Sequence, residues 1–184
     1  MIYPIVVYGS PVLRKIAKEI DVTYPKLSAL IEDMFETMNV SDGLGLAAPQ
    51  IGRSVRLIVI DANPLAEDDP TLEGFRIVLI NPNILEETGE LWAFTEGCLS
   101  LPNIREEITR PRIIRVQYFD EDFNFKDETY DGIKARIIQH EYDHLQGVLL
   151  IDRVSPLRKK LLKGKLNDIT KGKSETKYKT KVLK

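Results

Sequence analysis

The only two histidines of this 184-residue chain lie four residues apart, in the segment His140-Glu141-Tyr142-Asp143-His144. Residues four apart on an α-helix are separated by about one turn, so both imidazole rings project from one face. Two imidazoles in this arrangement can bind one metal ion, and the glutamate beside the first can activate a water. We therefore expect a metal-binding helix at the centre of the fold. Two incidental histidines on one helix are the alternative.

A catalytic zinc or iron ion usually has three protein ligands and one open position. No third histidine exists, and the only cysteine is Cys98, in Thr95-Glu96-Gly97-Cys98-Leu99-Ser100. A single cysteine is more often a small buried hydrophobic residue than a ligand. Because Gly97 lets the backbone pass close to another group, Cys98 is the candidate for the third ligand.

Apolar periodicity predicts an α+β fold in one domain, with strands packed around the metal-binding helix. Apolar residues from Leu27 to Met38 recur at helical spacing and indicate an amphipathic helix with a buried stripe. Turn residues within 120–127 suggest a hairpin connection, and the metal-binding helix begins at Asp131 or Gly132. The expected strands are Val55–Ile60, Arg76–Ile80 and Arg112–Phe119.

A last helix is expected over Leu157–Leu166, because Ser155-Pro156 is a good start signal. Its predicted apolar stripe consists of Leu157, Leu161 and Leu162. Beyond Thr170 the chain is Lys-rich and has no core pattern. We expect a catalytic domain over residues 1–166 and a Lys-rich C-terminal tail over residues 167–184.

Charge is distributed unevenly along the chain. The net charge is −2, yet residues 158–184 carry eleven Lys and Arg against two acids. Such a segment is either a solvated tail or a contact for a polyanion such as RNA. A single cysteine excludes an internal disulfide, and no apolar run reaches the roughly 20 residues of a membrane span. Both observations favour the cytoplasm.

The segment Gly43-Leu44-Gly45-Leu46-Ala47-Ala48-Pro49-Gln50 places its backbone close to another group. It is not a phosphate loop of the Gly-x-Gly-x-x-Gly type, because the spacing differs and no strand precedes it. The amide of Gln50 is a neutral donor that can polarise a carbonyl oxygen.

Three segments together resemble the motifs of the peptide deformylases. They are Gly43 to Gln50, Glu96 to Ser100, and Gln139 to His144. Their order and approximate spacing match, and the resemblance covers about residues 1 to 165. The chain departs from the family pattern in the acidic loop Ala62–Gly74, at Glu106 and in the tail, which leaves substrate preference and partners open.

The resemblance implies hydrolysis of the N-formyl group from the initiator methionine of new proteins, with release of formate. It implies that Cys98, His140 and His144 bind the metal and that Glu141 is the acid/base. Gln50 and the backbone N–H of Leu99 are expected to hold the oxyanion. The expected substrate-binding residues are Leu44, Gly45, Gly97, Arg105, Ile133 and Ile137, although Ile133 and Ile137 are equally compatible with plain core positions.

The cofactor expected from the resemblance is one divalent metal, Fe²⁺ in the cell, with Zn²⁺, Ni²⁺ or Co²⁺ in preparations. The expected partners are N-formyl-methionyl peptides and the ribosome, through the basic C-terminal segment. Neither a membrane nor a specific nucleic-acid sequence is expected as a partner.

Two other readings share the histidine pair. A zinc endopeptidase would take its third ligand downstream of His144, where Asp152 is a candidate. A structural metal site in a binding module would need a fourth protein ligand, and the chain has no second cysteine or third histidine to supply it.

Overall fold

The computed structural model describes residues 1–183, which form seven strands, four α-helices and five short 3-10 helices. The strands and α-helices are β1 (Ile5–Val6), α1 (Leu27–Val40), β2 (Gly45–Ala47), β3 (Leu57–Asp61), β4 (Arg76–Cys98), β5 (Leu101–Phe119), β6 (Phe125–Asp131), α2 (Gly132–Leu145), α3 (Pro156–Leu161), α4 (Lys163–Thr170) and β7 (Thr180–Lys181). Within these residues, no helix has the length and apolar content that crossing a bilayer would require.

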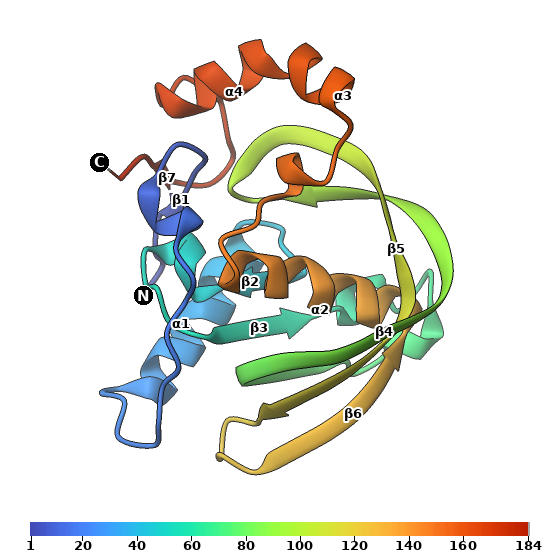
Figure 1. The fold of residues 1–184 in the computed structure, drawn as a ribbon. Coiled ribbons are helices and arrows are strands. Elements are labelled where there is room, and N and C mark those ends of the chain that lie inside the picture. The colour runs from blue at the N-terminus through green and yellow to red at the C-terminus, as the bar shows by residue number, and fades with distance from the viewer. Residues whose placement is uncertain (184) are drawn as a thin grey trace.

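The main sheet has the order β2-β3-β4-β5-β6, and every neighbouring pair is antiparallel. β1 and β7, from the two ends of the chain, form a separate parallel pair. β4 and β5 make a long hairpin whose register shifts at four places. Because such irregularities bend a strand and increase its twist, the hairpin curves around α2 (Figure 1).

β3 explains how the core is divided between α1 and α2. Its side chains alternate between two faces: Ile58 and Ile60 belong to the apolar cluster that includes α2, and Leu57 and Val59 to the cluster that includes α1. A strand buried on both faces reads as a continuous apolar run, which is why the sequence pattern identified it. The expected α+β fold with strands packed around the metal-binding helix is confirmed.

The C-terminal helix differs from its prediction. The chain forms two short helices, α3 and α4, in place of one helix over residues 157–166. Leu157 and Leu161 are exposed, so the predicted apolar stripe is wrong at both positions. Leu162, Leu166 and Ile169 are the side chains that pack inward, in a third cluster shared with the start of β5.

The hairpin strands are much longer than the sequence indicated. β4 continues for 23 residues and β5 for 19. Most residues from Leu85 to Thr95 are exposed, so this part of β4 shows no apolar alternation. Its backbone is instead satisfied by pairing with β5. The extension places Cys98 at the end of β4, directly before the two-residue turn into β5.

Candidate active site and metal centre

The three predicted metal ligands converge on one point. Cys98 comes from the end of β4, and His140 and His144 come from consecutive turns of α2. Their ligand atoms all lie within 4.8 Å of one another, and Sγ of Cys98 is 3.2 Å from Nε2 of His144. The two imidazole rings are 5.3 Å apart between centroids and inclined at 69°. This spacing suits three donors around one ion.

Glu96 orients the first histidine. Its Oε2 lies 2.9 Å from Nδ1 of His140. When Nδ1 carries the proton and donates it to this carboxylate, the lone pair of Nε2 is free to bind a metal. Glu96 is 5% exposed. Burial opposes its ionisation, but hydrogen bonds from His140 and Arg110 outweigh burial and hold the pKa of Glu96 well below its usual range.

A buried ion network keeps Glu96 in place. Arg110 donates from Nε and Nη2 to the two oxygens of Glu96, at 2.7 and 2.9 Å. Its Nη1 donates to Oδ2 of Asp143 at 2.8 Å. Arg136 donates to Oε1 of Glu96 at 2.9 Å. Because each buried charge has an opposite partner, the network is a rigid support for His140.

The donor set fits a divalent metal. One thiolate and two imidazoles suit zinc or iron and leave a fourth position open. Two buried polar atoms beside the cluster, Oε2 of Glu141 and Nδ1 of His144, have no hydrogen-bond partner within residues 1–183. Asp152 does not belong to the metal-binding group found within residues 1–183; its carboxylate pairs with Arg14 and accepts from the backbone N–H of Leu149. The geometry therefore gives no support to an endopeptidase-type ligand set.

Glu141 is held in a dry environment beside the ligands. It is 4% exposed, and burial raises the pKa of its carboxyl to about 7, against the lowering effect of His140. It lies against Gly45, where an added Cβ would be 2.6 Å from Oε1 of Glu141. A carboxyl with a pKa near neutrality can both accept and return a proton. Gly45 is thus required for Glu141 to occupy this position.

Gln50 faces the cluster from the short 3-10 helix Ala48–Ile51. Its Oε1 accepts from the backbone N–H of Ala47 at 2.7 Å, which fixes the orientation of the amide. Its Nε2 is consequently directed at Sγ of Cys98, 3.9 Å away. The side chain therefore has both a structural contact and a donor aimed into the site.

A cavity of about 380 Å³ opens onto the cluster. It is lined by most of the predicted substrate-binding residues, namely Leu44, Gly45, Gly97, Arg105 and Ile137, and by Gln50, Cys98, Leu99, His140 and Glu141. Ile133 does not line it and instead packs against the core between α2 and the sheet. Ile137 belongs to both the cavity wall and that core.

Several residues of the site had no predicted role. Glu96 and Arg136 build the support of His140, and Phe94 and Tyr178 contribute to the cavity wall. The signal for Glu96 was available, since a metal-binding histidine usually donates its second N–H to a carboxylate. No comparable signal pointed to Tyr178, which lies 80 residues beyond Cys98.

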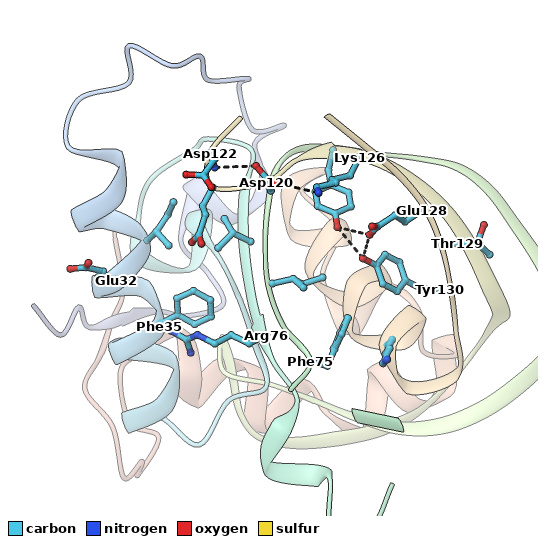
Figure 2. A pocket seen from close by; sticks show the side chains of 16 residues that line it. Glu32, Phe35, Phe75, Arg76, Asp120, Asp122, Lys126, Glu128, Thr129 and Tyr130 are labelled. Atoms are coloured by element: carbon cyan, nitrogen blue, oxygen red, sulfur yellow. Dashed lines mark hydrogen bonds and ion pairs between the residues drawn. The ribbon is translucent and has the colours of Figure 1, made fainter. Parts of the chain in front are cut away.

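A second hollow, of about 840 Å³, lies between α1 and the strands β4 to β6 (Figure 2). Its central polar groups satisfy one another: Tyr118 donates to Glu128 at 2.7 Å, and Tyr130 donates to the same oxygen. The metal-binding group found within residues 1–183 does not include any of these side chains. Although larger, this hollow lacks the features of a hydrolytic centre.

A metal-ligand triad beside a buried carboxyl at the end of a cavity defines a metal-dependent hydrolase. The family model described as polypeptide deformylase matches residues 2–160. The chain therefore belongs to the peptide deformylase family, metal-dependent enzymes that remove the N-formyl group from the N-terminal methionine of newly synthesised proteins and release formate.

Individual relatives agree with this assignment. A peptide deformylase of Christiangramia forsetii is 51% identical over 97% of this chain and 95% of its own length. The crystal structure of a peptide deformylase from Legionella pneumophila superposes with a TM-score of 0.81 at 37% identity, covering 93% of this chain and 96% of that one. The enzyme from Thermotoga maritima gives a TM-score of 0.76 at 44% identity, covering 85% and 99%.

Proposed function

We propose that Cys98, His140 and His144 hold one divalent metal and that Glu141 is the acid/base for hydrolysis of the formyl amide. One observation carries this assignment: the three donor atoms converge beside a buried carboxyl that has one unpartnered oxygen. A bound divalent metal supplies Lewis-acid polarisation of the formyl carbonyl and lowers the pKa of water.

The residues around the metal-binding group are proposed to transfer the proton and to stabilise the oxyanion. Glu141 takes a proton from the attacking water, whose oxygen bonds to the formyl carbon. The C–N bond then breaks, and Glu141 returns the proton to the amine of the departing methionine. The amide of Gln50 and the backbone N–H of Leu99 donate to the carbonyl oxygen as negative charge develops on it.

The cavity wall accounts for recognition of the methionine. Leu44 and Ile137 give it an apolar lining for the side chain, with Gly97 at its edge. We propose that the backbone of Gly45 pairs with an extended peptide and that Arg105 contacts the peptide beyond its first residue; both residues line the cavity, and Arg105 is exposed. Ile133 supports Ile137 from the adjacent core.

The metal in the cell is proposed to be Fe²⁺. Thiolate and imidazole donors accept iron as well as zinc, and the same site takes Zn²⁺, Ni²⁺ or Co²⁺ during preparation. Purification without oxygen, followed by elemental analysis and assay, tests this. Iron bound in proportion to activity supports it. Full activity with zinc alone, in protein isolated anaerobically, contradicts it.

We propose the ribosome as a partner, contacted through the basic C-terminal segment, and the cytoplasm as the location. Lys160, Lys163 and Lys165 are exposed on α3 and α4, and none forms an ion pair within residues 1–183. Association with a polyanion should weaken steeply with salt. Co-sedimentation with ribosomes at two salt concentrations, compared with a Lys160→Glu/Lys163→Glu variant, tests the contact.

The activity is tested directly by measuring formate released from formyl-Met-Ala-Ser, with acetyl-Met-Ala-Ser and an internal peptide as controls. We expect hydrolysis of the formyl peptide alone. Cleavage of the internal peptide would support the endopeptidase reading instead.

A further inference from the structure

The segment that follows α4 returns across the molecule to the active site. Asn103 donates to the backbone oxygen of Glu175 at 2.9 Å, β7 pairs with β1, and the backbone N–H of Leu183 donates to Oγ of Ser10 at 2.9 Å. These contacts join the last residues of the chain to its first strand and to the start of β5 (Figure 1).

Burial alternates along this segment. Thr176, Tyr178 and Thr180 are half-buried, whereas Lys177 and Lys179 are exposed. This period of two is that of an extended strand with one face against the protein. Tyr178 therefore points inward, where it lines the active-site cavity.

The hydroxyl of Tyr178 binds the turn that carries the predicted thiolate ligand. It donates to the backbone oxygen of Leu99 at 2.9 Å, and Leu99 follows Cys98 directly. The next carbonyl, of Ser100, accepts from the backbone N–H of Tyr8 at 2.9 Å. Burial, with the nearby Cys98 sulfur, raises the pKa of Tyr178 to about 12, so its hydroxyl keeps its proton and remains a donor.

The turn needs external support because it is short. Leu99 and Ser100 connect β4 to β5 with a register shift between Gly97 and Cys98, so the strand ladder alone does not fix this corner. Tyr8 and Tyr178 hold its two carbonyls from outside the sheet. The side chain of Leu99 also packs closely, since a Cβ on Gly43 would lie 2.9 Å from its Cδ1.

We propose that Tyr178 is a positioning residue for deformylation: its hydroxyl fixes the Cys98–Leu99 corner, and its side chain contributes to the wall of the substrate cavity. The proposal rests on the proposed roles of Cys98 as metal ligand and Leu99 as oxyanion donor. It does not assign Tyr178 any contact with the reacting atoms.

The test compares two variants that each remove one hydrogen-bonded tyrosine hydroxyl and keep the ring. Tyr178→Phe loses the bond to Leu99, and Tyr118→Phe loses the bond to Glu128 in the second hollow. In the full-length metal-loaded enzyme, we expect Tyr178→Phe to lower kcat for formyl-Met-Ala-Ser about fivefold, the equivalent of one net hydrogen bond, with KM little changed. Tyr118→Phe should leave kcat unchanged.

Two further measurements distinguish a positioning role of Tyr178 from a general effect on stability. In metal-free protein, Cys98 of Tyr178→Phe should react faster with iodoacetamide than Cys98 of the wild type. In Co²⁺-loaded protein, the thiolate-to-metal absorption band should shift in Tyr178→Phe and not in Tyr118→Phe. Wild-type kcat, alkylation rate and absorption band in a folded Tyr178→Phe protein would overturn the proposal. If the wild type releases no formate, the proposed function fails, whereas the alkylation comparison still tests the positioning of Cys98.

Discussion

Glu141 and Glu128 are both carboxyl groups at the wall of a hollow, yet their surroundings are opposite. Glu128 accepts hydrogen bonds from Tyr118 and Tyr130, and burial together with Glu128 raises the pKa of both tyrosines. Glu141 is more deeply buried and has one oxygen without a partner within residues 1–183. The larger hollow contains the satisfied carboxylate, and the smaller cavity contains the unsatisfied one.

This difference distinguishes the predicted catalytic carboxyl, Glu141, from a structural one, Glu128. A buried polar group without a partner costs roughly 1–3 kcal/mol, so each such group calls for an explanation. At Glu141 the neighbouring donor atoms of Cys98, His140 and His144 offer that explanation. At Glu128 the tyrosines already complete the contacts. Cavity size alone would have selected the wrong hollow.

The largest effect is expected from removing the thiolate. Cys98→Ala should abolish stoichiometric metal binding and deformylation, because the two imidazoles that remain are too few to hold the ion tightly. Elemental analysis after dialysis measures this, and circular dichroism verifies the fold. A Cys98→Ala protein that keeps one tightly bound metal would contradict the ligand assignment.

The two glutamates can be compared directly by the same substitution. Glu141→Gln should retain the metal but lower kcat on the order of 10²-fold or more, because an amide cannot accept the proton of the water. Glu128→Gln should leave kcat unchanged and lower the melting temperature, because it weakens the contacts with Tyr118 and Tyr130. Similar kcat losses in both variants would remove the distinction between the two hollows.

Gln50 has a structural contact and a predicted catalytic one, and Gln50→Ala removes both. As an oxyanion donor it should contribute up to roughly 3 kcal/mol, so kcat should fall by about 10²-fold while KM changes little. The backbone N–H of Ala47 also loses its acceptor, so some loss of melting temperature is expected. A destabilised protein with normal kcat would show that Gln50 only supports the glycine-rich segment.

The contribution of the hydrogen bond between Glu96 and His140 should be measurable as a change in metal affinity. Glu96→Gln removes the charged acceptor at Nδ1 and should weaken metal binding about 10- to 100-fold, as other changes to the partners of metal ligands do. Glu106→Gln is the matched control, because Glu106 is similarly buried, pairs with Arg158 and does not belong to the group of predicted metal ligands. Competition with a chelating dye measures both affinities, and equal values would contradict the role of Glu96.

The sequence predicted those parts of the molecule that have a periodic or motif signal. The stripe from Leu30 to Met38 is buried in α1, and the histidine pair lies on one face of α2. The exposed stretch of β4 has no such signal, because its backbone groups are satisfied by pairing with β5 and few of its side chains are buried. Leu157 and Leu161 had helical spacing but no neighbouring element to cover them.

Tyr178 illustrates a different limit. Alternation of polar and charged residues over Thr176–Lys181 is a weak strand signal, and the high lysine content favoured a solvated tail. The pairing of β7 with β1, together with the contacts that Asn103 and Ser10 make with this segment, brings it to the Cys98 corner. A contact between the two ends of a chain cannot be predicted from local pattern.

The separation of the two parts of the metal centre also has a consequence for folding. Cys98 and His144 are 46 residues apart, and β5, β6 and α2 must all be in place before they meet. Because closing a long loop costs entropy before its contacts can form, we expect the metal centre to form late in folding. A chain interrupted before α2 contains the thiol but neither imidazole, so it cannot form this centre. Metal then favours only the finished fold, by about 2.7 kcal/mol when the free ion is at a hundred times its dissociation constant.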